Sequence, residues 1–325
     1  MKISVDVGYS SVKAVSDTGK RIIFPSVVAP YRENPVNGTI YSQYKRHVVS
    51  TNGVKNLVGD AAIRSLTGIS SMDREKPVEL HDLFILAAAY LCGGNYNLVG
   101  RDEITLGVGL PFAYYRSQKD ELKTRLQRLA ADIQVDKGPE VHISFQDVSV
   151  YPQGLGLLFG VPSLPQSGFI GLIDIGCFTT DYMLFSMDDG EPVPIPDACG
   201  SIEAGTYLVQ QDISAGFLAQ TGAPLAYFMY RDALQAAQKN LPISFHGKEV
   251  NLSSVYQHSV QKTAQLILEN IRSVWVSRTE YLTLTAFAGG GAEMFRAHTN
   301  IFPGSIIINN PVFANADGFL KFLSD

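Results

Sequence analysis

Short apolar runs, separated by glycine, proline and polar residues, alternate along the chain with segments of helical periodicity. The apolar runs predict buried strands at 3–7, 11–15, 21–28, 46–50, 103–109, 141–145, 147–151, 172–175, 281–287 and 302–308. Apolar residues at helical spacing predict helices at 79–91, 117–131, 225–238, 254–277, 293–298 and 315–322. A further helix is predicted from Gly200 through Phe217, with Ser201 as its N-cap. Strands followed by helices, twice over, predict α/β layering in two similar halves.

Two short stretches far apart in the chain share one pattern. Residues 3–15 form an apolar run, a glycine turn and a second strand, and residues 172–181 repeat this order. Counterparts lie 168 positions apart: Asp6 and Asp174, Gly8 and Gly176, Ser11 and Thr179. The repetition predicts two equivalent β-hairpins, and the rest of the chain is interpreted as the scaffold that brings them together.

The predicted turns carry groups suited to phosphates and a divalent cation. Glycine has no Cβ, so the neighbouring backbone N–H groups can approach an anion closely. In the first turn the donors are the amides of Tyr9, Ser10 and Ser11, the two serine hydroxyls and the ammonium of Lys13. A hydrated Mg²⁺ between Asp6 and Asp174 is expected, because this ion keeps most of its waters and accepts one or two carboxylates.

A third motif follows the predicted strand 281–287. The segment Ala288–Ala292 contains three consecutive glycines and precedes the predicted helix 293–298. A helix N-terminus favours the α-phosphate side of a nucleotide, and glycines leave room for a flat base. The alternative is a glycine-rich turn that only serves packing.

Composition narrows the function classes. The net charge of −5 gives no electrostatic footprint for direct DNA binding. No apolar run is long enough to cross a membrane, and the acidic Asp6 stands where a signal peptide would be apolar. Cys92, Cys177 and Cys199 have no metal-binding spacing, so we expect reduced thiols in a cytoplasmic protein. The six histidines likewise show no metal-binding spacing.

The three motifs together resemble the actin, Hsp70 and sugar-kinase ATPase superfamily. Its five motifs are matched at Asp6–Lys13 (phosphate 1), Val150–Gly160 (connect 1), Asp174–Asp181 (phosphate 2), Gly289–Ala292 (adenosine) and Ala314–Phe322 (connect 2). The chain is most similar to the ParM/StbA group of bacterial actin-like proteins that segregate plasmids. The short chain, the polar segment after Pro25 and the Phe313–Ala316 lead into the last helix carry this likeness.

The resemblance implies an actin-like, ribonuclease H-like α/β fold. Each of two similar domains would centre on a five-stranded mixed sheet with helices on both faces, with the nucleotide in the cleft between them. Domain I is expected at 1–162, with a small β-rich insertion at about 30–76, and domain II at 163–311. The closing helix, about 312–325, is expected to pack back onto domain I.

The resemblance also implies roles for individual residues. Asp6 and Asp174 match the acidic pair that organises the attacking water and, through water, Mg²⁺. Gln153 matches the residue that orients the attacking water. A glutamine is a weak base, so it would orient the water without deprotonating it; the alternative is a cap on the following helix. Asp181 is either a further Mg²⁺ contact or a strand-edge acid. The implied nucleotide contacts are Gly8, Tyr9, Ser10, Ser11, Lys13, Gly176, Cys177, Phe178, Thr179, Glu203, Gly205, Gly289, Gly290, Gly291 and Ala292.

The implied function is a slow Mg²⁺-dependent ATPase that forms filaments and segregates plasmid DNA. ATP, or GTP, would be the nucleotide. The partners would be further copies of the chain and a DNA-binding adaptor of ParR type, with no direct contact to nucleic acid or membrane. Two alternatives stay open: a small-molecule kinase of the same superfamily, and another bacterial actin-like cytoskeletal ATPase. Fold analogy alone does not decide between them.

Overall fold

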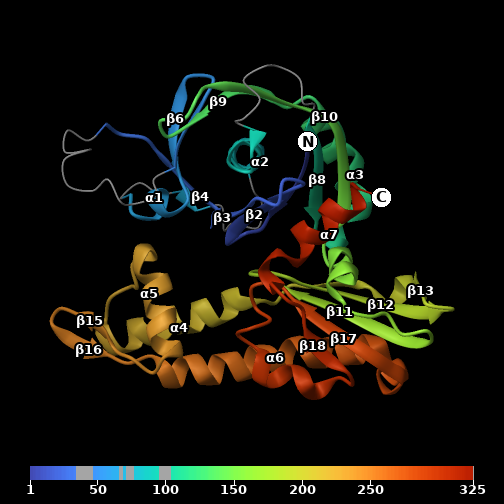
Figure 1. The fold of residues 1–325 in the computed structure, drawn as a ribbon. Coiled ribbons are helices and arrows are strands. Elements are labelled where there is room, and N and C mark those ends of the chain that lie inside the picture. The colour runs from blue at the N-terminus through green and yellow to red at the C-terminus, as the bar shows by residue number, and fades with distance from the viewer. Residues whose placement is uncertain (34–46, 66–68, 71–76, 95–103, 325) are drawn as a thin grey trace. The chain divides into compact units, whose positions relative to one another are not determined.

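The structure is a computed structural model that describes residues 1–33, 47–65, 69–70, 77–94 and 104–324 of the 325 residues. The chain divides into two compact units (Figure 1). Unit 1 comprises Met1–Leu110, Tyr114–Gly156 and Asn315–Asp325, and unit 2 comprises Pro111–Ala113 and Leu157–Ala314. Much of the predicted insertion at 30–76 lies outside the described residues. Among the described residues, no helix is long and apolar enough to cross a membrane.

Unit 1 is built on a ten-stranded sheet with the order β3-β2-β1-β8-β10-β9-β5-β6-β4-β7. Its strands are β1 (Lys2–Val7), β2 (Ser11–Ser16), β3 (Arg21–Pro25), β4 (Val27–Pro30), β5 (His47–Thr51), β6 (Val54–Val58), β7 (Ile69–Ser70), β8 (Ile104–Leu110), β9 (Ala130–Val135) and β10 (Val141–Pro152). The first five strands of this order form the five-stranded mixed sheet that the resemblance implies: β1–β2 and β2–β3 pair antiparallel, and β1–β8 and β8–β10 pair parallel.

The helix α2 (Val78–Leu91) forms the centre of unit 1, and Figure 1 shows the strands of the unit curving around it. Residues 83–90 of α2 are all buried, which explains why this segment is apolar on every side and not along one stripe. The connection between β3 and β4 also requires the sheet to curve. Strand β3 ends at Pro25, and β4 begins at Val27. These strands stand near opposite ends of the strand order, yet only Ser26 separates them in sequence.

One strand prediction is wrong. The segments 141–145 and 147–151 are not two paired strands but one strand, β10, interrupted by a bulge between Phe145 and Asp147. The first half pairs antiparallel with β9, and the second half pairs parallel with β8. Buried and exposed residues alternate along β10, and the two consecutive exposed residues, Gln146 and Asp147, interrupt this alternation. A bulge and a turn both produce such an interruption, so the sequence pattern did not distinguish them.

Unit 2 repeats the arrangement of the first five strands of unit 1. Its sheet has the order β13-β12-β11-β17-β18, and β14 also pairs with β12. The pairs β13–β12 and β12–β11 are antiparallel, and β11–β17 and β17–β18 are parallel, as in their unit 1 counterparts. The strands are β11 (Gly168–Ile175), β12 (Thr180–Asp188), β13 (Glu191–Pro194), β14 (Gly200–Ile202), β17 (Leu282–Ala288) and β18 (Ser305–Ile307), with a separate hairpin of β15 (Ile243–Phe245) and β16 (Lys248–Val250).

The remaining helices are α1 (Asp60–Ile63), α3 (Phe112–Gln127), α4 (Thr206–Thr221), α5 (Tyr230–Gln238), α6 (Ser253–Trp275) and α7 (Ala314–Phe322). The buried face of α6 includes Ile267, Ile271 and Trp275, as its periodicity predicts. Trp275 packs closely against β11, because a Cβ on Gly171 would lie 2.5 Å from its Cη2.

Two helix predictions in unit 2 are wrong. The predicted helix from Gly200 begins only at Thr206, and Ser201 lies in β14 and caps no part of α4. The predicted α-helix 293–298 is a series of turns followed by a 3₁₀ helix, Arg296–Ile301. Elsewhere the predicted helix 225–238 consists of a 3₁₀ turn, Tyr227–Met229, followed by α5.

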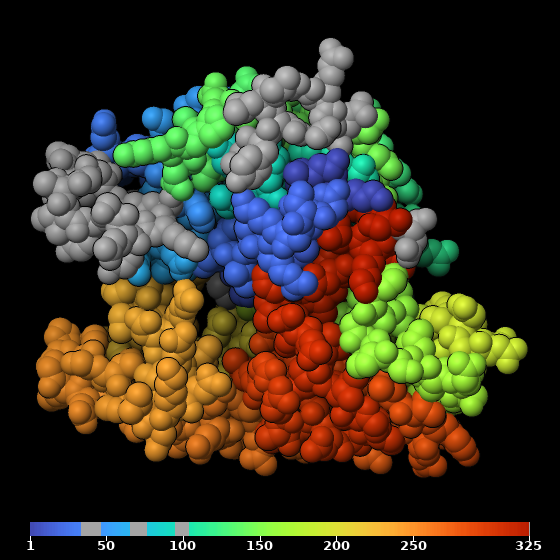
Figure 2. Space-filling view, in the orientation of Figure 1, coloured from blue at the N-terminus to red at the C-terminus, as the bar shows by residue number. Residues whose placement is uncertain are grey.

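The last helix, α7, belongs to unit 1 and contacts its first strands. Figure 2 shows the red atoms of the C-terminal segment against the blue atoms of the N-terminal segment. Arg21 Nη2 lies 2.9 Å from Asp317 Oδ1, and the Ser4 hydroxyl donates to the carbonyl of Ala316. Burial raises the pKa of Asp317, although Arg21 opposes this shift. Phe319 and Phe322 stack on Tyr151 with ring centroids 5.4 and 5.2 Å away.

The three cysteines are free. Cys92 is buried at the end of α2, and burial raises the pKa of its thiol to about 12. Burial also raises the pKa of Cys199. Since the thiolate is the reactive form, neither residue is a candidate nucleophile.

The contact between α7 and residue 156 gives a test of the fold. A Cβ on Gly318 would overlap Gly156 Cα, whereas a Cβ on Gly290 would meet no atom within 4 Å. Alanine at a helical glycine normally stabilises a protein. We expect Gly318→Ala to lower the free energy of unfolding by about 1–3 kcal/mol instead, because the backbones must separate. Denaturant unfolding measures this value, and Gly290→Ala should change it by less than about 0.5 kcal/mol.

Candidate functional site

The first predicted turn connects β1 and β2. Asp6 lies opposite Lys13 in this hairpin, and the N–H of Gly8 donates to the Ser11 carbonyl at 3.1 Å. A Cβ on Gly8 would lie 2.8 Å from this same carbonyl oxygen and 2.7 Å from Lys13 Nζ. Only glycine therefore fits at position 8. Of the turn residues, Ser10 is exposed, and Tyr9 and Ser11 are half-buried.

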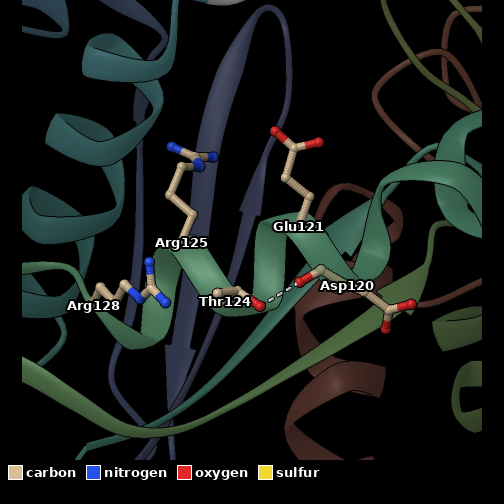
Figure 3. Close-up of a pocket in the computed structure, with 5 residues that line it drawn as sticks. All are labelled: Asp120, Glu121, Thr124, Arg125 and Arg128. Atoms are coloured by element: carbon tan, nitrogen blue, oxygen red, sulfur yellow. Dashed lines mark hydrogen bonds between the residues drawn. The ribbon is translucent and has the colours of Figure 1, made fainter.

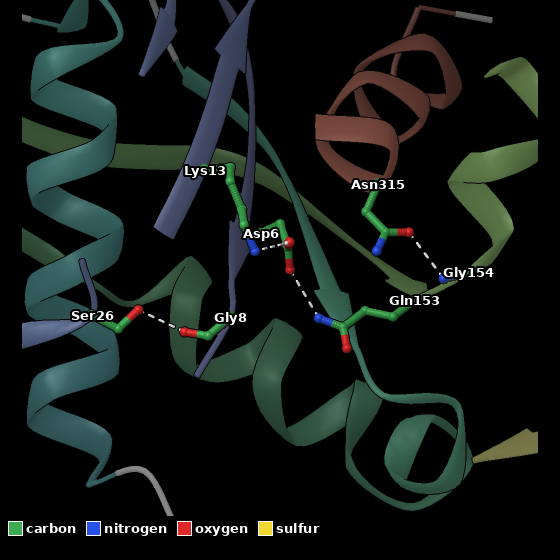
Figure 4. A network of polar contacts seen from close by, with 7 residues as sticks. All are labelled: Asp6, Gly8, Lys13, Ser26, Gln153, Gly154 and Asn315. Carbon is green, nitrogen blue, oxygen red and sulfur yellow. Dashed lines mark hydrogen bonds and ion pairs between the residues drawn. The ribbon is translucent and has the colours of Figure 1, made fainter. Parts of the chain in front are cut away.

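Asp6 is the centre of a polar network in unit 1 (Figure 4). Its Oδ2 lies 3.1 Å from Lys13 Nζ, and its Oδ1 accepts a hydrogen bond from Gln153 Nε2 at 2.9 Å. Asp6 is 5% exposed, so a charge at this position requires such partners. The structure thus brings Gln153 to the other two predicted site residues, Asp6 and Lys13, although it is 147 positions from Asp6 in the sequence.

Gln153 follows the end of β10, and its neighbours fix its backbone. Its N–H donates to the Leu110 carbonyl at 2.7 Å. Gly154 has a positive φ of 90°, and its N–H donates to Asn315 Oδ1 at 2.9 Å. Asn315, at the start of α7, is buried, and sequence reasoning did not identify it. A cap on the following helix would direct the Gln153 amide toward residues 155–160, whereas in the structure it is directed to Asp6.

The second predicted turn, between β11 and β12, has the same construction. Gly176 N–H donates to the Thr179 carbonyl at 2.9 Å, and a Cβ on Gly176 would lie 2.8 Å from that oxygen. Asp174 is 8% exposed and lies opposite Asp181, as Asp6 lies opposite Lys13. Cys177 is buried, and Phe178 packs on Tyr207 with ring centroids 4.4 Å apart.

The two hairpins differ where Lys13 is replaced by Asp181. Asp181 is 2% exposed, and its Oδ1 accepts hydrogen bonds from the N–H of Phe112 at 3.1 Å and from the Ser201 hydroxyl. The Ser201 Oγ also accepts from the N–H of Ala113 at 3.1 Å. Asp181 and Ser201 therefore cap the first residues of α3, where unpaired N–H groups favour a negative charge. This contact supports a structural role for Asp181 over the alternative of a further Mg²⁺ ligand.

The start of α4 supports the second turn. The N–H groups of Thr206 and Tyr207 donate to the carbonyls of Gly176 and Cys177 at 3.1 and 2.9 Å. A Cβ on Gly205 would overlap the Cys177 carbonyl oxygen, so glycine is required for this approach. Glu203 is exposed in the segment that precedes α4.

The third motif packs against the end of β11. A Cβ on Gly289 would overlap Asp174 Oδ1, and a Cβ on Gly291 would overlap the Ile175 side chain. Gly291 N–H donates to the Ile175 carbonyl at 2.9 Å, and Ala292 is fully buried. Gly290 has open space beside it. The turns at 291–295 provide no α-helix N-terminus, so the expected helix-dipole contribution is absent from this described segment.

A separate shallow pocket lies along α3 (Figure 3) and is lined by Asp120, Glu121, Thr124, Arg125 and Arg128. Its charges are mixed in sign. Arg125 pairs with Asp82, and the Thr124 hydroxyl donates to the Asp120 carbonyl at 2.8 Å. The pocket contains none of the predicted site residues. The described residues also contain no cluster of three or more histidine, cysteine or acidic side chains that could hold a metal ion.

The cap on α3 gives a test of the role of Asp181. Asp181→Ala leaves the Phe112 N–H and the Ser201 hydroxyl without their acceptor, so we expect the free energy of unfolding to fall by about 1–3 kcal/mol. Asp181→Asn keeps Oδ1 as an acceptor, so its free energy of unfolding should fall by less than that of Asp181→Ala. Denaturant unfolding with and without Mg²⁺ measures this effect. A loss that occurs only when Mg²⁺ is present would instead favour a metal-binding role.

Each of the two parts of the chain matches a family of actin-like proteins. Residues 4–156 match the family "Actin like proteins N terminal domain", and residues 172–300 match "Archaeal actin homologue MreB-like, C-terminal". An archaeal actin homolog of Thermoplasma volcanium is 27% identical over an alignment of 331 positions, which covers 98% of this chain and 97% of that protein. An archaeal actin homolog of Thermoplasma acidophilum is 25% identical over an alignment of 328 positions, which covers 98% of this chain and 97% of the relative.

Solved structures show the same likeness. The structure of a 15-stranded ParM filament from Clostridium botulinum superposes with a TM-score of 0.89 at 25% identity, covering 99% of this chain and 98% of that one. An archaeal actin homolog in complex with ADP superposes with a TM-score of 0.77 at 24% identity, covering 99% of both chains, and this likeness concerns the fold alone. The fold and the family matches together identify the chain as an actin-like protein of ParM type.

Proposed function

We propose that this chain is a nucleotide-dependent, filament-forming ATPase. The observation that carries the proposal is the duplicated glycine turn, in which Gly8 and Gly176 each lie against the carbonyl three residues further on. Such turns present backbone N–H groups, which bind anions. The likeness to a ParM filament over 99% of the chain supports self-assembly. The archaeal homolog with a similar fold was solved in complex with ADP, which supports an adenine nucleotide as the ligand.

The residues fit a nucleotide with Mg²⁺. A Cβ at Gly8, Gly176 or Gly289 would overlap or crowd neighbouring oxygens of the protein, so the close packing of these turns requires glycine, whereas Gly290 has open space beside it. Asp6 and Asp174 are buried carboxylates at the second-last position of their strands, and such carboxylates suit a hydrated Mg²⁺. When bound, Mg²⁺ supplies positive charge that offsets the charge of the phosphates.

The chain's own residues have distinct parts in the proposed reaction. The amides of the two turns bind and orient the phosphates, and Lys13 adds a positive charge beside the first turn. Gln153 orients the attacking water through its side-chain amide, and its bond to Asp6 restricts the orientation of that amide. An amide does not remove a proton from water, so hydrolysis should be slow and suited to timing filament disassembly. Glu203 and Gly205 are proposed to lie near the ribose.

The biological role we propose is segregation of plasmid DNA through an adaptor of ParR type. The net charge of −5 supports an adaptor in place of direct contact with DNA. The alternative is another actin-like cytoskeletal ATPase, which the identity with archaeal actin homologs favours. The two differ in cargo. An adaptor that recruits plasmid DNA to filaments supports the first role, and filaments that sediment without plasmid DNA in the presence of candidate adaptors support the second.

Light scattering and negative-stain electron microscopy test assembly. We expect scattering to rise when ATP and Mg²⁺ are added to the protein at tens of micromolar, and micrographs to show filaments. Chelation of Mg²⁺ by EDTA should prevent this rise. The absence of any nucleotide-dependent scattering or filaments would contradict the proposal.

Asp6→Asn tests the proposed site. This variant keeps one side-chain oxygen that can accept from Lys13, and its NH₂ group can donate to the Gln153 side-chain oxygen once that amide rotates, whereas Asp6→Ala would leave the largely buried Lys13 ammonium without its partner. We expect Asp6→Asn to abolish Mg²⁺-dependent nucleotide binding while the thermal midpoint of unfolding changes little. The exposed acid Asp132 provides the matched control, and Asp132→Asn should bind nucleotide as the parent does.

Gln153→Ala tests the water-orienting role. Loss of the amide should slow phosphate release by about 10- to 100-fold, with filament assembly retained, because assembly depends on bound nucleotide and not on its cleavage. Gln134→Ala is the control, since this amide donates to the Gly138 carbonyl at 2.8 Å and lies in β9. Equal hydrolysis rates for Gln153→Ala and the parent would exclude the role.

A further inference from the structure

Ser26 is a buried polar residue that contacts the first glycine turn from outside the hairpin. It has no solvent exposure and lies between β3 and β4. Its hydroxyl donates to the Gly8 carbonyl at 2.6 Å (Figure 4). Its N–H donates to the Ser10 carbonyl at 3.1 Å. One residue therefore holds two carbonyl groups of the turn.

These contacts fix the directions of two peptide N–H groups. In a trans peptide the C=O and the following N–H point in opposite directions, and the described peptides are trans. The Gly8 carbonyl shares its peptide with the Tyr9 N–H, and the Ser10 carbonyl shares its peptide with the Ser11 N–H. Because Ser26 holds both carbonyls, both N–H groups are directed away from Ser26.

In the second turn, donors outside the hairpin also bind the carbonyl of the turn glycine, but the second carbonyl that they bind is at a different position. The N–H groups of Thr206 and Tyr207 hold the carbonyls of Gly176 and Cys177 at 3.1 and 2.9 Å. By the same geometry the N–H groups of Cys177 and Phe178 are directed away from the start of α4. In both turns, donors outside the hairpin thus hold the carbonyl of the turn glycine and one further turn carbonyl. The two hairpins repeat in sequence, but the groups that donate to their carbonyls do not. The donors to the first turn are the hydroxyl and N–H of Ser26, and the donors to the second turn are the first N–H groups of α4.

We propose that Ser26 is a positioning residue for phosphate binding: it orients the Tyr9 and Ser11 amides toward the phosphates of the nucleotide. Ser26 is fully buried and acts through the turn carbonyls, so its role is to position the amides. The inference rests on the proposed function, since it concerns how the first turn binds phosphate. The Gly8 carbonyl, bonded to Ser26, cannot rotate its oxygen toward an incoming phosphate, where it would repel the anion.

The sheet keeps Ser26 in place. Ser26 joins β3, at one end of the ten-strand order, to β4 near the other end, so the sheet curving around α2 fixes both of its neighbours. Pro25 lies opposite Ser11 in the β2–β3 pair, which sets the register of Ser26 with the turn. The preorganised amides therefore need no rearrangement when phosphate binds.

The affinities of ADP and adenosine, measured by calorimetry on the full chain, test the proposal. Adenosine lacks the phosphates, so the ratio of the two affinities isolates phosphate binding. Ser26→Ala removes one hydrogen bond to the turn, and we expect it to lower the ADP-to-adenosine ratio by about 3- to 10-fold. The affinity for adenosine should stay at the parent value, and in steady-state hydrolysis KM for ATP should rise more than kcat falls.

Ser16→Ala is the matched control. Ser16 is also a buried serine of unit 1, but it lies at the far end of β2 and its hydroxyl pairs with that of Thr18 at 2.8 Å. The ratio of the ADP affinity to the adenosine affinity should be the same in Ser16→Ala as in the parent. Ser26→Cys, which replaces the hydroxyl by a weaker donor of similar shape, supplies the same comparison if Ser26→Ala does not fold.

The outcomes distinguish a failure of the proposed role of Ser26 from a failure of the proposed function. A parent that binds ADP more tightly than adenosine, with an unchanged ratio in both Ser26 variants, overturns the role of Ser26 and leaves the proposed function intact. Equal losses of ADP and adenosine affinity also overturn it, because they indicate a general structural effect. A parent that binds neither ligand overturns the proposed function, and the inference with it.

Discussion

The close contact between a glycine and the carbonyl three residues further on is the constraint from which the rest of the site follows. At Gly8 and at Gly176 a Cβ would lie 2.8 Å from that oxygen, so no other residue closes these hairpins in the same way. In each hairpin the second-last residue of the first strand, two positions before the turn glycine, is an acid: Asp6 in one and Asp174 in the other. The tight closure also leaves the turn with carbonyls that must be satisfied from outside the hairpin, by Ser26 in one unit and by α4 in the other.

Each unit uses its own fold to meet this requirement. In unit 1 the sheet curves around the fully apolar part of α2, and this curvature joins β3 to β4 at Ser26. The closing helix α7 lies against the same strands, and Asn315 at its start binds Gly154 beside Gln153. In unit 2 the glycines at 205, 289 and 291 let α4 and the turn after β17 approach the end of β11. The common pattern is a strand end surrounded by segments that only glycine allows to come close.

Much of the fold could be predicted from the sequence because its elements have clear periods. The strands of both hairpins, the long helix α6 and the closing helix α7 lie within a few residues of their predicted positions. The predictions that were wrong concern places where the local sequence pattern is compatible with two different structures. A shift in alternation at residues 146 and 147 fits a turn as well as a bulge, and the pairing partners β8 and β9 decided for the bulge. Ser201 has the chemistry of a helix cap, but the helix that it caps is α3 and not the one that follows it.

The sequence by itself determined the two-fold repetition, the acids at the strand ends and the glycines of the turns, because these features are local and recur at a fixed offset. Only the tertiary structure decided which distant groups bind them. Gln153 reaches Asp6 because β10 and β1 both pair with β8, and Ser26 reaches Gly8 because the sheet closes around α2. Asp181 binds the start of α3, although its position in the hairpin equals that of Lys13. Such contacts depend on strand order and curvature, which hydrophobic periodicity does not encode.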